Sequence, residues 1–573
     1  MHIVPSSILL IPLLSFPAVS SLTSAFFKQN GIPVSNYSLN TFGYFPARWR
    51  EESKQMVKQM FYFAYDNYMQ HAWPKDELNP IDCCGRGPDW KNPENININD
   101  VLGNFSLTLV DSLDSLIIFG NITEFYRAVG LVIDTVSFDQ DVTVQVFETT
   151  IRMMGGLLSA HLLLNDTRVF PHIHLPTYQN ELLTLAADLG ERLTWAFEGS
   201  PTGIPCPRVN LQQGVPTNKE SCRTNCLAGA GSLSVEWGLL SQLTGEERYG
   251  RLAKEAVKNL WKRRSATTGL LGNTIDVQTG AWADSLSGVG AGMDSYYEYL
   301  LKAYILFGDD EYLDIWTDAN SNSRIFHRFG GSDCGTNGTI HPFYVNVHMQ
   351  TGNTIGTWID SLGAAFPAVQ LLAGDTADAI CLHHYYAEIW QRYGALPERF
   401  DVQHEKAHIP LYPLRPELAE STYFLYRATK NPFYLHIGRN MVKSIEAMAK
   451  VKCGYATVHS VLDGTLEDRM ESFFLSETLK YLYLLFDEEN PVNVHEEKLL
   501  FTTEGHIIPL RAQYHKSFSK SSDGSSTKAL YSCRALSSLY RYALPIDELY
   551  WRNYSEIPWQ VPSFSEPNQC GLV

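Results

Sequence analysis

Apolar side chains recur at helical spacing along most of the chain from Tyr44 onward, and this pattern predicts a mainly helical protein. Helices are predicted at 46–71, 105–119, 122–135, 145–163, 178–198, 229–243, 246–263, 293–307, 309–321, 357–372, 375–393, 416–428, 432–448 and 471–486. Many of these segments stop at a glycine, the usual residue at a helix C-terminus. Several connections are short, which favours antiparallel helical hairpins.

The fourteen predicted helices make seven hairpins, and some, such as the segment 473–486, are apolar on nearly all sides. Helices of that kind are buried. An all-α toroid, an (α/α)7 barrel with an inner and an outer ring, would bury them. A solenoid is the alternative, although no fixed repeat period occurs. Strand-like pieces at 341–349 and 457–462 are expected to form short β-hairpins in loops, and no strand–helix alternation suggests a parallel sheet.

The chain divides into one large domain with a short segment at each end. Residues 1–25 contain an apolar run followed by small residues, which predicts a secretory signal peptide. No Lys or Arg precedes Lys28, so an uncleaved signal anchor stays open as the alternative. Residues 26–43 form an expected lead-in and 44–510 the domain itself. Residues 511–573 form a tail that is partly rich in serine.

Glycosylation motifs and cysteines point independently to the secretory pathway. Six N-x-S/T sequons begin at Asn36, Asn104, Asn121, Asn165, Asn337 and Asn553. All ten cysteines lie beyond the predicted signal, and in an oxidising compartment several should pair. The sequence does not fix their connectivity.

Composition narrows the class of ligand. The 62 acidic residues outnumber the 45 Lys and Arg residues, giving a net charge of −17, which argues against a nucleic-acid partner. Aromatic residues make up 12% of the chain. An acidic protein rich in Trp and Tyr suits a neutral polar ligand such as a sugar.

The segment 414–421, L-R-P-E-L-A-E-S, resembles a helix start placed in apolar surroundings. Pro416 suits the first helical position, and Glu417 and Glu420 fall on one face of the first turn. A buried helix that opens with Arg415 and two carboxylates is expensive to build. Either these groups form a structural ion network or they carry out chemistry.

Three further acids lie at or near predicted helix starts. Glu148 has Arg152 one turn later, which alone would explain it as an ion pair. Asp294 follows a glycine-rich segment and resembles an N-cap, and Glu471 opens a buried helix. In a toroid the starts of the inner helices gather at one mouth, where Asp294, Glu471 and Glu417 would converge. Such a mouth suits glycoside hydrolysis, which needs two carboxyl groups, or a hard cation bound by oxygen.

Six segments together resemble the class I α-1,2-mannosidases, glycoside hydrolase family 47. They are 105–116, 146–152, 294–302, 414–421, 470–481 and 502–506, and they occur in the family's order. Within that family, the segments 79–83 and 452–457 are most similar to the ER degradation-enhancing α-mannosidase-like proteins.

The resemblance implies an (α/α)7 barrel, an inverting mechanism and a bound Ca2+. By position, Glu148 would be the general acid, Glu417 the base and Asp294 a third carboxylate, while Thr503 would bind calcium through its hydroxyl and carbonyl oxygens. The supporting residues would be Arg152, Arg415, Glu420, Glu471 and Glu504.

The resemblance also implies a disulfide between Cys83 and Cys453. Two departures from the processing enzymes of the family, Gly292 for an Arg and Ser361 for a His, would open the mouth of the site.

The implied activity is a calcium-dependent α-1,2-mannosidase of the endoplasmic reticulum lumen. It would trim high-mannose N-glycans on misfolded glycoproteins and so direct them to degradation. A protein disulfide isomerase-type oxidoreductase is kept as a candidate partner, and the membrane only if the signal is uncleaved. The rival hypothesis is a lectin-like receptor that binds such glycoproteins with little turnover.

Overall fold

The computed structural model describes residues 42–215, 222–330 and 342–515. The predicted signal, almost all of the lead-in and most of the tail lie outside these ranges. So do the sequons at Asn36, Asn337 and Asn553.

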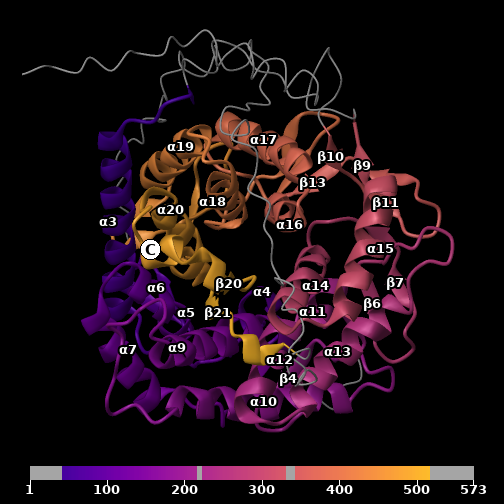
Figure 1. Ribbon diagram of the computed structural model, residues 1–573, viewed down its shortest axis with the longest axis horizontal. Coiled ribbons are helices and arrows are strands. Elements are labelled where there is room, and N and C mark those ends of the chain that lie inside the picture. The colour runs from indigo at the N-terminus through magenta and orange to yellow at the C-terminus, as the bar shows by residue number, and fades with distance from the viewer. Residues whose placement is uncertain (1–41, 216–221, 331–341, 516–573) are drawn as a thin grey trace, which may run out of the picture.

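Helices form a closed double ring around a central axis (Figure 1). The outer ring consists of α3 (Ala47–His71), α7 (Ile122–Thr135), α10 (Glu181–Glu198), α13 (Arg248–Trp261), α15 (Asp310–Phe326), α17 (Thr376–Tyr393) and α19 (Phe433–Met448). The inner ring consists of α5 (Leu107–Asp111) with α6 (Leu113–Ile118), then α9 (Gly155–Asn165), α12 (Ser234–Thr244), α14 (Asp294–Phe307), α16 (Phe366–Leu372), α18 (Glu417–Thr429) and α20 (Leu479–Phe486). Each inner helix packs on the next, and α20 packs on α3, so the last hairpin closes the ring on the first helix. The predicted (α/α)7 barrel is confirmed.

The two rings differ in their apolar pattern because they face different surroundings. Every residue of α20 is buried, whereas α13 buries one stripe at Tyr249, Ala253, Ala256, Val257 and Leu260. An all-round apolar helix needs neighbours on every side, and a striped helix needs them on one side only. The sequence pattern therefore already separates inner from outer helices.

Most predicted helix boundaries are confirmed to within a few residues, and two are wrong. The helix predicted at 309–321 continues to Phe326. The start of the segment 357–372 is not helical: Trp358–Asp360 forms strand β13, and Ser361–Ala365 forms a 3₁₀ turn. Here pairing with strand β14 (Arg399–Asp401) overrides the local pattern.

The strands are short and antiparallel and lie in the loops between helices, as expected. Three-stranded sheets are β5 (Thr224–Cys226), β6 (Thr274–Asp276) and β7 (Trp282–Asp284); β8 (Leu286–Ser287), β11 (Asn346–His348) and β12 (Thr354–Gly356); and β13, β14 and β15 (Lys406–Ile409). Two-stranded pairs are β1 (Glu77–Asn79) with β2 (Cys84–Arg86), β3 (Thr143–Gln145) with β4 (Arg208–Asn210), β9 (Arg328–Phe329) with β10 (Phe343–Tyr344), β16 (Lys450–Val451) with β17 (Gly454–Tyr455), β18 (Thr457–Val458) with β19 (Leu466–Glu467), and β20 (Leu499–Phe501) with β21 (Ile507–Pro509). Short helices α4 (Ile96–Asn99), α8 (Val146–Thr149), α11 (Leu227–Gly231) and α21 (Pro491–Val494) complete the fold.

Two disulfides tie loops together within the described ranges. Cys83 and Cys453 are bonded, which confirms the pairing that the resemblance implied, and Cys206 is bonded to Cys222. Within the residues that the structure describes, none of the helices combines the length and apolar character required to cross a bilayer.

The hairpin β20–β21 is held against the inner helices by a buried ionic network. Lys480 of α20 donates to Asp114 at 2.9 Å and to the carbonyl of Gly505 in the hairpin turn at 2.7 Å. The other carboxylate oxygen of Asp114 accepts the backbone N–H of Ile507 at 2.9 Å. The Lys480 and Asp114 side chains are fully buried. Their charges therefore fix the hairpin turn, which carries Thr503, without help from solvent.

We expect Lys480→Met to lower the free energy of unfolding by about 3–5 kcal/mol, because buried Asp114 would lose the nearer of its two cations and keep only His506, at 3.5 Å. Thermal and urea denaturation would measure the loss. The matched control is Lys450→Met, since Lys450 is 42% exposed and pairs with Glu446 on the outer surface. That change should alter stability by less than about 1 kcal/mol. Equal effects of the two substitutions would contradict a structural role for the buried pair.

Candidate active site

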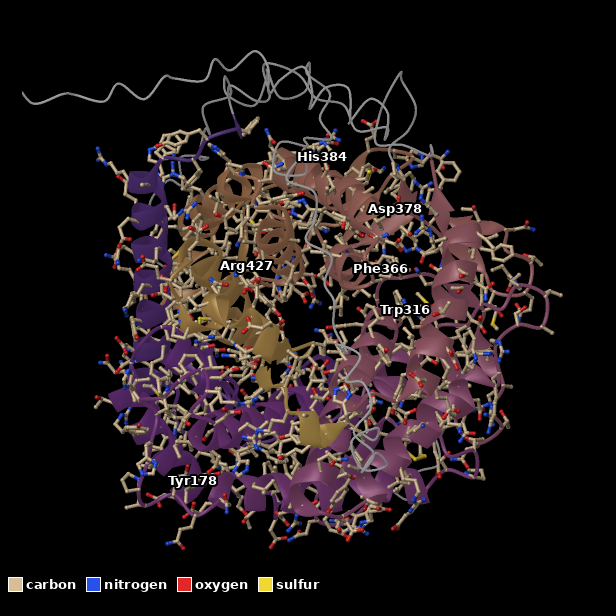
Figure 2. The ribbon with its side chains drawn as sticks, in the orientation of Figure 1. Tyr178, Trp316, Phe366, Asp378, His384 and Arg427 are labelled. Carbon is tan, nitrogen blue, oxygen red and sulfur yellow. A yellow bond between two sulfur atoms is a disulfide. The ribbon has the colours of Figure 1, made fainter. Side chains whose placement is uncertain are left out.

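A cleft of about 440 Å³, its open mouth included, lies between the inner helices α14, α16 and α18. It is lined by Val289, Asp294, Ser295, Glu298, Leu362, Ala365, Phe366, Val369, Pro416, Glu417, Glu420, Glu477 and Thr503. In Figure 2, Phe366 lies beside the central opening of the ring, whereas Tyr178 and His384 lie toward the periphery. The cleft thus has an apolar wall facing a group of carboxylates.

The chain enters α18 through a strained turn that sets the position of Glu417. Leu414 has φ 64°, a left-handed conformation that leucine rarely adopts, and its side chain is fully buried. The carbonyl of Leu414 accepts a bond from the Thr478 hydroxyl at 2.6 Å. Strain of this kind persists where surrounding contacts hold it, and it is common at functional sites. Helix α18 starts at Glu417, one residue later than the proline-based prediction.

Glu417 is buried, and one of its two carboxylate oxygens accepts no hydrogen bond from the described residues. Its Oε1 lies 3.7 Å from Arg415, whose guanidinium is held in turn by Glu398 at 2.5 and 3.0 Å. Its Oε2 is buried and has no hydrogen-bond partner within the described ranges. Burial raises the pKa of Glu417 to about 6, and Arg415 opposes that rise. The carboxyl is therefore still mostly ionised at neutral pH.

Asp294 is the first residue of α14 rather than its N-cap, a place that Met293 takes. One of its oxygens accepts the backbone N–H of Ser295 at 2.9 Å. Burial raises the pKa of Asp294 to about 7, and the nearby charge of Glu417 adds to the rise. A carboxyl of this kind is largely protonated below neutral pH and can donate a proton.

The glycines before Asp294 allow the backbone to approach its neighbours closely. A Cβ at Gly290 would lie 3.1 Å from a carboxylate oxygen of Asp360. Gly292 has φ 81°, and its carbonyl accepts the N–H of Ala228 at 2.8 Å. A side chain at Gly290 would crowd the Asp360 carboxylate, and one at Gly292 would lie 3.0 Å from the Asn273 amide in a backbone conformation that favours glycine.

Glu148 lies immediately before a π-helical turn, Thr150–Met154, that carries Arg152. Arg152 donates to Glu148 at 2.9 Å from Nε, which confirms the predicted ion pair, and to the Ser472 hydroxyl at 3.1 Å. The ring of Phe473 lies 5.3 Å from the Arg152 guanidinium and 5.7 Å from that of Arg415. Phe473 therefore contacts both guanidinium groups with its ring.

The remaining predicted supporting residues surround this arrangement. Glu504 lies 3.8 Å from Arg152, and Glu471 accepts a bond from Arg469 at 3.0 Å. Glu471 was expected to open a helix, but it lies before the helix start. The helical segment begins at Phe474, with a second π-helical turn that runs to Thr478. Glu420 lines the cleft itself, and burial raises its pKa well above the ordinary value.

Thr503 presents oxygen atoms to the acidic side of the cleft. Its hydroxyl donates to Glu298 at 2.8 Å, and its N–H donates to the Tyr299 hydroxyl at 3.2 Å. Within the described ranges no hydrogen bond ends on its carbonyl oxygen. Glu298, Glu417, Glu420 and Glu477 line the same cleft.

A hard cation fits this donor set, because it prefers oxygen and would offset the repulsion between the carboxylates. Even so, no three acidic, histidine or cysteine side chains of the described residues form a ready metal cage. Thr503, water and ligand hydroxyls would therefore have to supply the contacts.

Sequence reasoning missed several groups that the structure brings to the site. Glu298 follows Asp294 by four residues on α14, and this i,i+4 spacing was a usable signal. Glu398 and Phe473 carried no comparable signal, since their roles depend on Arg415 and Arg152 from other elements.

Three sequons fall in described loops or helix ends. Asn104 and Asn165 are exposed. Asn121 is half-buried, and its side chain accepts the N–H of Glu124 as the cap of α7. Their glycosylation stays a prediction.

The chain is similar to proteins of known family. The model of glycosyl hydrolase family 47 matches residues 60–510. The ER degradation-enhancing alpha-mannosidase-like protein 1 of Schizosaccharomyces pombe is 46% identical over 82% of this chain, which spans only 58% of that relative's length. The alpha-mannosidase I MNS4 of Arabidopsis thaliana is 44% identical to this chain, and the match covers 81% of this chain and 71% of the plant protein's length.

A solved structure supports the same relationship. The alpha-1,2-mannosidase from Trichoderma reesei superposes with a TM-score of 0.70 at 27% identity. The match covers 80% of this chain and 99% of the fungal chain. These comparisons confirm the resemblance stated from the sequence motifs.

Proposed function

Because the chain belongs to glycosyl hydrolase family 47, we propose that it is a calcium-dependent, inverting α-1,2-mannosidase. It would remove mannose from high-mannose N-glycans of misfolded glycoproteins in the endoplasmic reticulum lumen and so target them for degradation. The observation that carries the proposal is the buried, unpartnered oxygen of Glu417 in a cleft that Asp294 and Thr503 also line.

In this proposal Glu417 is the base. Its free oxygen takes a proton from water while the water oxygen attacks the anomeric carbon and the glycosidic bond breaks on the opposite face. Glu148 protonates the departing sugar oxygen, and Asp294 either shares that task or replaces Glu148 in it. Inversion requires roughly 6.5–9.5 Å between the two working carboxyl groups, which leaves room for the water.

Thr503 would hold calcium through its hydroxyl and carbonyl oxygens. When bound, the cation would orient sugar hydroxyls and the attacking water. The chain's own contribution is to keep the Thr503 turn rigid through Lys480 and Asp114 and to surround it with carboxylates that favour a cation.

The relatives' names, which include "ER degradation-enhancing" and "alpha-mannosidase", support the proposed substrate and compartment. An oxidoreductase partner is supported by one observation: Cys84 is an exposed free thiol next in sequence to the Cys83–Cys453 disulfide. The lectin-like receptor is the alternative outcome of the first experiment below.

We expect Glu417→Gln and Glu148→Gln each to reduce mannose release by about 10²–10⁴-fold, because each removes a proton-transfer group. Glycan profiling of a high-mannose glycoprotein incubated with purified protein and calcium would measure this, with and without an added oxidoreductase. Glu311→Gln, on the outer helix α15, is the control and should match the wild type. Glycan binding without trimming by the wild type under every condition would favour the receptor instead.

The pH profile should report Glu417 and Asp294. Glu417 works ionised, so kcat/KM should fall about tenfold between pH 7 and pH 5 as the base protonates with a pKa of about 6. If Asp294 donates the proton, activity should also fall above its pKa of about 7. Arg415 lowers the pKa of Glu417, so Arg415→Gln should move the acid limb to higher pH. An acid limb unmoved by that substitution would exclude Glu417 as its source.

Calcium removal should lower both activity and stability. Calcium at 100 times its Kd stabilises a binding protein by about 2.7 kcal/mol, and a chelator should abolish that gain. Thr503→Val, which removes the hydroxyl, should reduce the calcium-dependent rise in Tm. Differential scanning calorimetry with calcium or chelator would measure it, and a Tm in Thr503→Val that responds to calcium as in the wild type would refute the assignment.

A further inference from the structure

One helix, α14, holds the turn at Thr502 and Thr503 through three of its side chains. The Thr503 hydroxyl donates to Glu298 at 2.8 Å, and its N–H donates to the Tyr299 hydroxyl at 3.2 Å. Lys302 donates to the carbonyl of Thr502 at 3.3 Å and also pairs with Glu298. The same helix begins with Asp294. Helix α14 therefore both carries a proposed catalytic carboxylate and holds the turn that contains Thr503.

Among these contacts, the bond to Tyr299 depends on a second residue. A phenol has one hydrogen to donate, and it accepts another bond only on the side away from that hydrogen. The Tyr299 hydroxyl donates to Oε1 of Glu236, on α12, at 2.6 Å. Glu236 therefore directs the hydroxyl hydrogen away from Thr503 and leaves an oxygen lone pair free for the Thr503 N–H.

Among the described residues, Tyr299 is the one side chain that forms a hydrogen bond with Glu236. Its side chain is buried, with 1% of the residue exposed, and within the described ranges its Oε2 has no hydrogen-bond partner. Burial raises the pKa of Glu236 to about 8, so the carboxyl is mostly uncharged at neutral pH. Burying an acid with one unpartnered oxygen costs free energy, and the bond from Tyr299 offsets only part of that cost.

We propose that Glu236 and Tyr299 form a positioning relay for Thr503, an inference that rests on the proposed calcium site. The relay fixes the peptide between Thr502 and Thr503. With its N–H and hydroxyl hydrogen committed to α14, Thr503 is left with its carbonyl and the hydroxyl lone pairs for a cation. Neither relay residue is among those that line the cleft, so both act on the cation through Thr503.

The test is calcium binding by isothermal titration to the full chain after chelator treatment. Tyr299→Phe should weaken calcium affinity by about 10-fold or more, the usual effect of removing a partner that orients a ligand. Glu236→Leu should do the same, because the Tyr299 hydroxyl would lose its acceptor. Glu236→Gln keeps a carbonyl acceptor for that hydroxyl and should stay within about threefold of the wild type.

Tyr296→Phe is the matched control. Tyr296 lies on the same helix and is fully buried, but its hydroxyl lies 3.5 Å from the carbonyl of Val257, on the outer helix α13. The calcium affinity of the Tyr296→Phe variant should equal that of the wild type. The Tm of each variant in chelator distinguishes positioning from general destabilisation. Tyr299→Phe and Tyr296→Phe should lower the Tm by similar amounts, so that only their calcium affinities differ.

Calcium affinity of Tyr299→Phe and Glu236→Leu within twofold of the wild type would overturn the relay while leaving the proposed calcium site intact. Failure of Glu236→Gln to retain affinity would also overturn it. A wild-type chain that binds no calcium would overturn the calcium part of the proposed function and the relay with it.

Discussion

The site depends on a hairpin turn buried against a ring of helices. Apart from Thr503, which faces the cleft, the backbone of this turn is buried, so its carbonyl and N–H groups need partners from the surrounding protein. Lys480 and Asp114 meet that need for Gly505 and Ile507. Because both are buried and oppositely charged, the turn has one stable position, and the oxygens of Thr503 face the cleft from it.

A second constraint is the concentration of carboxylates around that turn. Buried acids repel one another and lose solvation, which raises the pKa of Asp294, Glu417 and Glu420. Arg415 offsets part of the rise at Asp294 and Glu417, and Lys302 does so at Glu420. The result is a graded set of acids, with pKa values of about 6 for Glu417 and about 7 for Asp294, that a uniform ion network would not produce.

Irregular backbone is concentrated where these groups lie. Arg152 and Glu477 are on π-helical turns, and Leu414 is left-handed just before Glu417. A regular helix or turn at these places would direct the side chains elsewhere. Local strain and an unsatisfied Glu417 oxygen are thus features of the same few segments.

The periodicity of the sequence determined the number, order and approximate length of the helices, because inner and outer positions bury different fractions of a helix surface. Rare acidic residues in apolar segments also pointed to Glu148, Asp294 and Glu417, and the family resemblance added Thr503. Only the tertiary structure decided that Glu398 holds Arg415 and that Tyr299 holds Thr503. Only it showed that Glu417 is governed by burial more than by its helix end. Such contacts join elements far apart in the chain, and the spacing of hydrophobic residues does not predict which side chains from different elements will come into contact.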